Sequence, residues 1–237
     1  MKVKHTIMQE LDHRHHNALH LAHRWFAFLE APVGNMATHL SIFHPKIQLS
    51  GHRGLHLFAH DHQSLEAWFS GISDVISSHH IVHSNYLTAE NGEGLLNMVV
   101  AYQSPANSGV HGSIISYETR IEFSTKGARF ISLDKTPILK NTRLEYETSW
   151  AANRVLARVH AELAGITGSD GQLRTILGEK VRQIVVHTNA SEASRAYQVL
   201  VSCNSGDSVK SQVLHLIVSD DGYASLPTIT QMELLRT

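Results

Sequence analysis

Apolar residues recur at helical spacing in three stretches of the chain, 7–30, 61–77 and 143–165, and each predicts an amphipathic helix. In the first stretch one face carries Ile7, Leu11, Ala18, Ala22, Trp25 and Leu29. Pro32 and Gly34 end that pattern, and Gly165 is a plausible C-terminal cap of the last helix. Asp61, directly before the middle helix, is placed to cap its N-terminus.

Strand-like segments follow the helices in two places. The segment 95–103, "LLNMVVAYQ", comes after Asn91-Gly92, a pair typical of tight hairpin turns. Two longer segments, 112–133 and 211–229, each turn at a glycine within a polar cluster. Helices followed by a meander of antiparallel strands predict an α+β fold with helices on one face of a sheet.

The order of these segments occurs twice. "IVHSN" at 81–85 and "VVHTN" at 185–189 are nearly identical, and each leads into strand, polar break and strand. Self-similarity of this length predicts two related domains, residues 1–137 and 138–237, joined near 135–141.

Several motifs in the first half resemble those of the nuclear transport factor 2-like superfamily, the SnoaL-like or cystatin-like α+β cones. They are "RWFAFLEAP", "THLSIFHPKIQLSG", "LEAWFSGI" and "SSHHIVHSN" leading into "ENGEG". The resemblance implies two domains of this fold, each with N-terminal helices packed on a curved antiparallel sheet. Members commonly dimerise through the open faces of their sheets, so the repeat implies a fused pseudo-dimer whose sheets cover each other. Two domains that tumble independently are the alternative.

The two halves differ in length between the first helix and the repeated motif. Glu30 precedes His83 by far more residues than Ala164 precedes His187, so the second half lacks about 30 residues. By the resemblance, those residues close one end of the cone. We therefore expect the pocket in residues 1–137 and a structural role, with the pocket absent or collapsed, for residues 138–237.

The overall composition excludes some functions. The net charge is -1, with 42% hydrophobic and 17% charged residues, so a basic surface for nucleic acid or an anionic membrane is not expected. Neither a secretory signal nor a run of about 18 apolar residues is present, which predicts a cytoplasmic protein. Cys203, the one cysteine, is expected to be a buried structural thiol.

Sixteen of the 19 histidines lie at or before His111. On the first helix His13, His16, His20 and His23 fall opposite the apolar stripe, where they form either a metal-chelating ladder or a solvated polar face. We favour the solvated face and expect no metal site. His15 lies at the edge of the apolar stripe, as a core residue or as part of a pocket lining.

Strand alternation within "SSHHIVHSN" places His80 on one face and His79 with His83 on the other. Because His83 recurs as His187 in the half without a predicted pocket, we assign it to a shared structural face. His80 is then the chemical candidate. By the resemblance, a histidine near this strand position works with an aspartate and a tyrosine in dehydration or isomerisation.

The predicted catalytic residues are His80 as acid and base, Tyr102 as a hydroxyl donor, and Asp61. For Asp61 the alternative role is to cap the helix that follows it. Predicted ligand-binding residues are His15, Trp25, Phe43, Trp68 and Tyr117. The alternative for Trp25, Phe43 and Trp68 is an ordinary place in the core, and for Tyr102 and Tyr117 it is packing within the sheet. Together with the resemblance, these residues imply a dehydratase, isomerase or cyclase that needs no cofactor and acts on a small, mostly apolar molecule. The alternative is a non-catalytic module for hydrophobic-ligand binding or assembly, and further association into a homodimer stays open.

Overall fold

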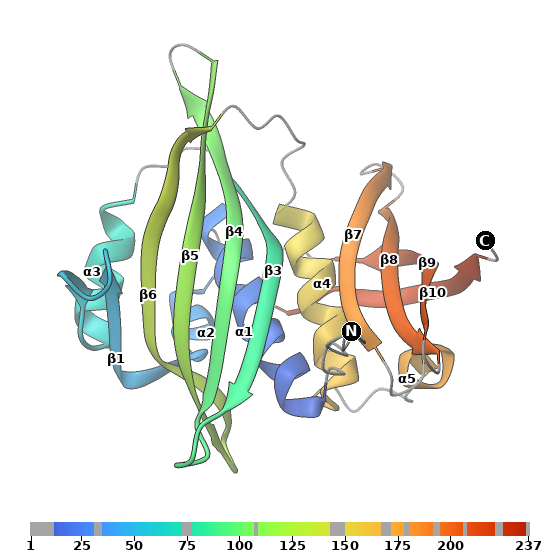
Figure 1. Ribbon diagram of the computed structural model, residues 1–237, viewed down its shortest axis with the longest axis horizontal. Helices are drawn as coiled ribbons and strands as arrows, with labels where there is room; N and C mark the ends of the chain where they lie inside the picture. The colour runs from blue at the N-terminus through green and yellow to red at the C-terminus, as the bar shows by residue number, and fades with distance from the viewer. Residues whose placement is uncertain are drawn as a thin grey trace, which may run out of the picture.

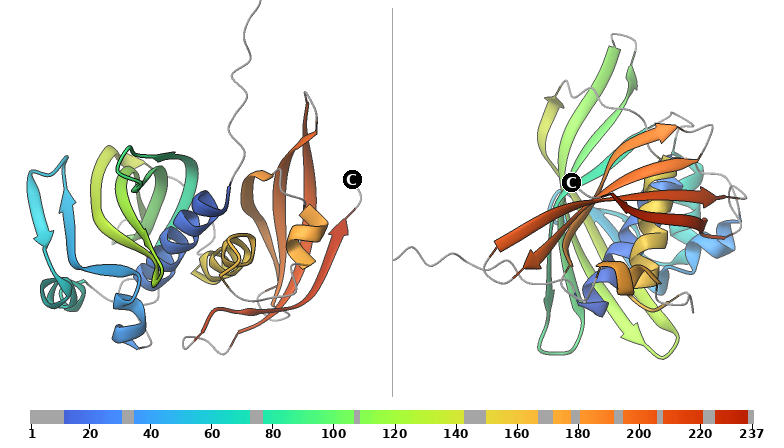
Figure 2. Two further views of the ribbon diagram at one scale, coloured as in Figure 1. Left: turned by 90° about the horizontal axis from the view of Figure 1, so that it is seen from below. Right: turned by 90° about the vertical axis from the view of Figure 1, so that its right-hand side faces the viewer.

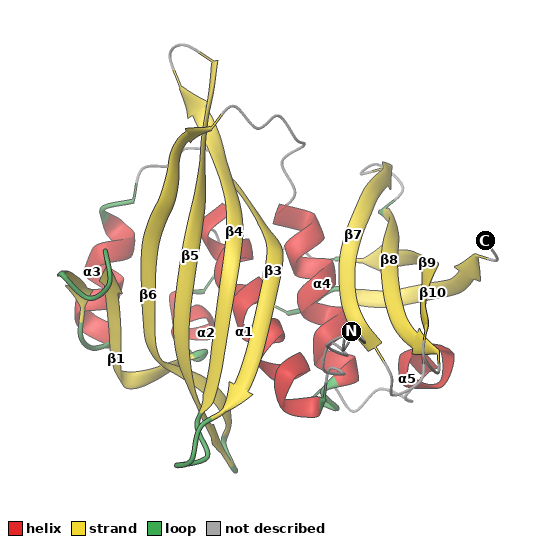
Figure 3. Cartoon of the chain, viewed as in Figure 1, coloured by secondary structure: helices red, strands yellow, loops and turns green. Residues whose placement is uncertain are grey.

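A computed structural model of the chain describes residues 12–30, 35–72, 77–106, 109–142, 150–166, 172–177, 181–191, 195–205, 208–220 and 225–235. It contains two sheets, each accompanied by one long helix (Figures 1 and 3). The fold is α+β, as the order of helical and strand patterns predicted.

The first half holds a six-stranded sheet with the strand order β2-β1-β6-β5-β4-β3. All its pairings are antiparallel except the parallel pair β1–β6. Its elements are α1 (His13–Glu30), α2 (Met36–Leu40), β1 (Phe43–Gly51), β2 (His56–Ala59), α3 (His62–Ser70), β3 (Ser78–Thr88), β4 (Gly94–Ala106), β5 (Gly109–Ser124) and β6 (Gly127–Thr142).

The second half holds a four-stranded antiparallel sheet with the order β10-β9-β8-β7. Its elements are α4 (Trp150–Leu163), α5 (Gln172–Leu177), β7 (Val181–Ser191), β8 (Ala196–Ser205), β9 (Ser208–Ser219) and β10 (Thr228–Leu235). In the described part of the chain only α5 lies between α4 and β7, whereas α2, β1, β2 and α3 lie between α1 and β3. This difference accounts for the shorter second half.

Local sequence signals set the ends of two elements as predicted. The Asp61 carboxylate accepts a hydrogen bond of 2.7 Å from the Ser64 backbone N–H and caps α3. Gly92, with φ of +83°, turns the β3–β4 hairpin, and its N–H donates to the Ala89 carbonyl at 2.9 Å. Both assignments are confirmed.

The two halves meet helix against helix. Helix α1 packs along α4, and the two sheets flank this pair on either side, as Figure 2 shows in its left view. Among the described residues, no strand of one sheet packs extensively on a strand of the other. The expectation that the two sheets cover each other is therefore wrong, because the polar faces of the helices form the contact instead.

Candidate active site

His79, rather than its neighbour His80, is the buried histidine of β3. His79 is 5% exposed, His80 is half-buried, and His83 is exposed. The pairing of β3 with β4 is irregular between Ile81 and His83. A bulge of this kind shifts the two-residue alternation, so counting along the strand wrongly placed His79 and His83 on one face.

A buried carboxylate lies beside the His79 ring. Glu30, the last residue of α1, is 6% exposed, and its Oε1 lies 3.4 Å from His79 Nδ1. Oε1 also accepts a hydrogen bond from the His79 backbone N–H. Nδ1 itself is buried and has no hydrogen-bond partner among the described residues. The two side chains thus form an imidazole–carboxylate pair shielded from water.

Asn153 of α4 completes this site from the second half of the chain. Its Nδ2 donates to both carboxylate oxygens of Glu30, at 3.1 and 3.2 Å, and to the His79 carbonyl at 2.9 Å. Its Oδ1 lies 2.6 Å from Nδ1 of His23. One amide side chain therefore ties α1, β3 and α4 together and fixes the Glu30 carboxylate.

Aromatic rings border the His79 side chain. Its ring centroid lies 5.1 Å from that of Phe26 and 5.0 Å from that of Tyr102, and Phe26 contacts Tyr117 edge-on. Burial raises the pKa of Tyr117 above its usual value, and the neighbouring Tyr102 raises it further. Tyr117 therefore keeps its proton at neutral pH, and its hydroxyl can donate a hydrogen bond.

The other predicted site residues lie in three separate places. Trp25 stacks on Trp68 at 5.9 Å and meets Phe43 edge-on at 5.5 Å, inside the first-half core. His15 is buried against Tyr86, and burial lowers its pKa to about 4. Asp61 begins α3, which packs on β1 and β2, whereas His80 lies on β3 at the opposite edge of the sheet. Of the three predicted catalytic residues, Tyr102 lies beside the buried pair of His79 and Glu30.

Sequence reasoning missed Glu30 and Asn153. One signal for Glu30 was available, since it is the one acidic residue of α1 and directly follows the apolar run "WFAFL". No local pattern marks Asn153, because its partners are distant in the sequence.

Of the histidine ladder of α1, His13 is exposed, as expected, but the other three histidines are not. His16, His20 and His23 are each 4% exposed and face α4, which corrects the sequence-based expectation. The helical spacing correctly placed these residues on one face, but it does not show that α4 covers that face. Among the residues that the structure describes, no group of three or more metal-ligating side chains is placed to hold an ion.

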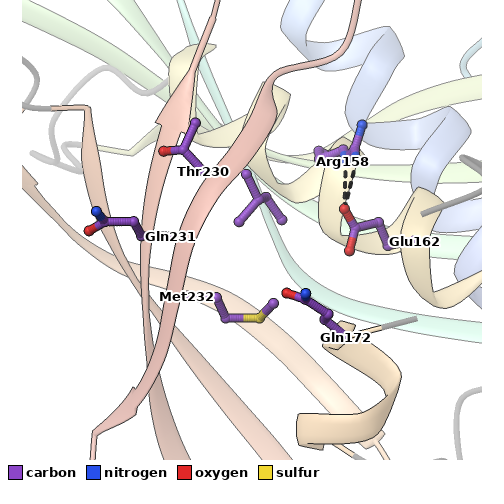
Figure 4. Close-up of a pocket in the computed structure, with 7 residues that line it drawn as sticks. Arg158, Glu162, Gln172, Thr230, Gln231 and Met232 are labelled. Carbon is purple, nitrogen blue, oxygen red and sulfur yellow. Dashed lines mark hydrogen bonds and ion pairs between the residues drawn. The ribbon is translucent and has the colours of Figure 1, made fainter. Parts of the chain in front are cut away.

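An open pocket lies in the second half, where none was expected (Figure 4). Its volume is about 350 Å³, and its lining consists of Arg158, Glu162, Gln172, Ile229, Thr230, Gln231 and Met232. Arg158 forms an ion pair of 2.8 Å with Glu162, so the charges at its wall are matched.

None of the helices in the described ranges combines the length and the apolar character that crossing a bilayer requires.

No protein-family model matches the sequence, and no curated protein matches it. Among solved structures, ActVI-ORFA from Streptomyces coelicolor is 12% identical, with a TM-score of 0.44 over 52% of this chain and 95% of the other. A hexachlorocyclohexane dehydrochlorinase, LinA type 2, is 9% identical, with a TM-score of 0.46 over 56% and 92%. An NTF2-like protein from Novosphingobium aromaticivorans is 8% identical, with a TM-score of 0.44 over 52% and 80%. Over about half its length the chain is similar to proteins with the NTF2-like, cystatin-like fold. Identities and TM-scores this low carry no conclusion about its activity.

Proposed function

We propose that the first half catalyses proton transfer on a small, mostly apolar molecule, as a dehydratase, isomerase or cyclase. The observation that carries the proposal is the buried His79 Nδ1, which lies 3.4 Å from the Glu30 carboxylate and has no hydrogen-bond partner within the part of the chain that the structure describes. An imidazole can both accept and donate a proton, and a buried carboxylate stabilises the imidazolium that forms.

Each residue has a distinct role in such a step. The imidazole of His79 takes a proton from a carbon of the substrate, and the electron pair of that C–H bond moves toward an adjacent carbonyl oxygen or expels a leaving group. Glu30, held by Asn153, orients the imidazole and offsets its positive charge. The Tyr102 hydroxyl donates to the oxygen on which charge develops. His79 then returns the proton to the product or to the leaving group.

The proposal is tested by following deuterium incorporation from D2O into a panel of small apolar ketones, with mass spectrometry as the readout. His79→Gln and Glu30→Gln are expected to lower the exchange rate by about 100-fold or more, in line with the usual contribution of a general base. Tyr102→Phe is expected to lower it less. The matched control is His83→Gln, an exposed histidine on the same strand. Full exchange activity in the His79→Gln variant would rule out the assignment.

The pocket of the second half favours a second candidate, a non-catalytic binding module. Its wall is largely polar, with the amides of Gln172 and Gln231 and the hydroxyl of Thr230, which suits a neutral polar ligand better than an apolar one. A Gln172→Ala variant that loses binding of a ligand found by screening, while His79→Gln keeps it, would favour this candidate over the enzyme.

A further inference from the structure

The contact between the two halves is a seam of histidines. From α1, His16, His20 and His23 face His160, Ala157 and Asn153 of α4, in reversed order, so the helices run antiparallel. His20 Nδ1 lies 2.8 Å from the Ala157 carbonyl oxygen, and His23 Nδ1 lies 2.6 Å from Asn153 Oδ1. His16 Nδ1 and His160 Nδ1 are 2.9 Å apart. We call the four histidines with Asn153 and Ala157 the histidine seam.

The hydrogen bonds define the protonation of the seam. Carbonyl and amide oxygens only accept, so Nδ1 of His20 and of His23 each donates. Between His16 and His160 one nitrogen donates and the other accepts. That bond requires at least one of the two rings to be neutral, because two imidazolium rings would bring two N–H groups into opposition.

The charged groups of the described residues that act on the pKa values of the seam histidines are cationic, not acidic. Burial lowers the pKa of His16 to about 3 and that of His20 and His23 to about 4, and it lowers the pKa of His160 well below its usual value. The neighbouring groups that lower these values further are themselves cationic or become so on protonation, namely His13, His15 and Arg24 on α1, Arg174 on α5 and His80 on β3.

The carboxylates and remaining cations around the seam are already engaged. Glu30 is bound by Asn153 and lies beside His79 of β3, and Glu162 of α4 pairs with Arg158. Arg154 of α4 pairs with Asp220. Among the described residues, neither Glu30 nor Asp12, whose Oδ1 accepts a hydrogen bond from the His15 backbone N–H, raises the pKa of a seam histidine.

Each half also has apolar contacts of its own. Helix α1 packs Trp25 and Phe26 toward its sheet, whereas α4 packs against α5 and β7 and contributes Val155, Leu156, Val159 and Leu163 to the core. The seam itself is built from polar groups and alanine. We therefore expect each half to keep these apolar contacts of its own when the seam opens.

We propose that the histidine seam is a pH-dependent contact. It holds the two halves together at neutral pH and separates in mild acid, while both sheets stay folded. This inference is independent of the proposed catalytic role of His79.

The direction and size of the effect follow from linkage. A histidine whose pKa is lower in the docked state favours docking fully above about pH 6.5, and this contribution is lost as the pH falls toward the lowered value. With the ordinary pKa in the open state, each of His16, His20 and His23 disfavours docking by about 30-fold at pH 5 relative to neutral pH.

The test uses the intact chain, with small-angle X-ray scattering and far-UV circular dichroism between pH 7.5 and 4.5. The radius of gyration is expected to rise as the pH falls below about 6, in the range where ordinary histidines charge, while the dichroism spectrum stays unchanged. An unchanged radius down to pH 4.5, or a loss of secondary structure at the same pH as the expansion, would overturn the proposal.

A variant separates the seam from the other histidines. His16→Gln/His160→Gln takes up fewer protons on opening, so its expansion is expected at lower pH and with a shallower transition than in the parent chain. The matched control is His111→Gln, an exposed residue of β5, whose transition should coincide with that of the parent. A shift in His111→Gln equal to that of the double variant would contradict the assignment to the seam, and the scattering of the parent chain decides the question even if the double variant fails to fold.

Discussion

Asn153 is the residue on which most of the buried polar contacts between the halves converge. Asn153→Ala removes the Nδ2 donor from the Glu30 carboxylate and from the His79 carbonyl, and it leaves His23 without its acceptor. A buried charge that loses its partners is strongly destabilising, so the free energy of unfolding should fall by about 2 to 4 kcal/mol. Urea denaturation at pH 7.5 measures this change.

Asn97→Ala is the matched control, since Asn97 is exposed on β4. Its effect should stay within about 0.5 kcal/mol. Equal losses of unfolding free energy in the two variants would mean that the hydrogen bonds of the Asn153 amide do not stabilise the contact between the halves.

The sequence predicted the role of Asp61 but not the burial of His79. The cap at Asp61 was predictable because the carboxylate and its Ser64 partner are three residues apart. His79 was missed because the irregular pairing of β3 depends on contacts with β4, which the period-two count does not include. A hydrogen bond between residues three positions apart was therefore predictable, whereas the burial of a strand residue that depends on the neighbouring strand was not.

At the scale of elements, the contact of His16 with His160 makes the two residues interdependent. His16→Leu alone leaves the His160 nitrogen buried without its partner and should lower the free energy of unfolding by about 1 to 3 kcal/mol. Adding His160→Leu replaces the polar pair by an apolar one, which often restores stability.

A double-mutant cycle by urea denaturation tests this expectation. The coupling energy between the two positions should be at least about 1 kcal/mol, as for residues in direct contact. Additive effects would indicate that the two rings do not interact in solution.

The face of a helix was harder to interpret than its spacing. The i, i+4, i+7 spacing of His16, His20 and His23 correctly predicted that they share a face. Whether that face meets water or another helix is decided by α4, more than 120 residues later in the chain. Periodicity carries no information about such a partner.

At the scale of the whole molecule, histidine modification distinguishes helix-to-helix docking from sheet-to-sheet docking. Diethylpyrocarbonate at pH 7 should label His83 and His111 rapidly, because both are exposed on the six-stranded sheet. His16, His20 and His160 should be protected. Peptide mass spectrometry gives the rates, and the reverse order would indicate that the sheets cover each other.

The repeat was evident in the sequence, but the way in which its copies associate was not. "IVHSN" and "VVHTN" lie in β3 and β7, which are edge strands of separate sheets. The difference in length was also predicted correctly, yet the second half carries an open pocket despite its missing elements. The sequence shows that the second half lacks about 30 residues. It does not show whether the remaining helices and strands enclose a pocket.

The reversed pairing of α1 and α4 has a consequence for how this protein can change. In an assembly of identical chains related by a two-fold axis, every substitution at the contact is duplicated on the opposing surface. Here one polypeptide supplies both surfaces, so a histidine on one helix can meet an asparagine or an alanine on the other. Covalent linkage thereby removes the symmetry constraint, and each side of the junction can be altered, by selection or by a protein engineer, without copying the alteration to its counterpart.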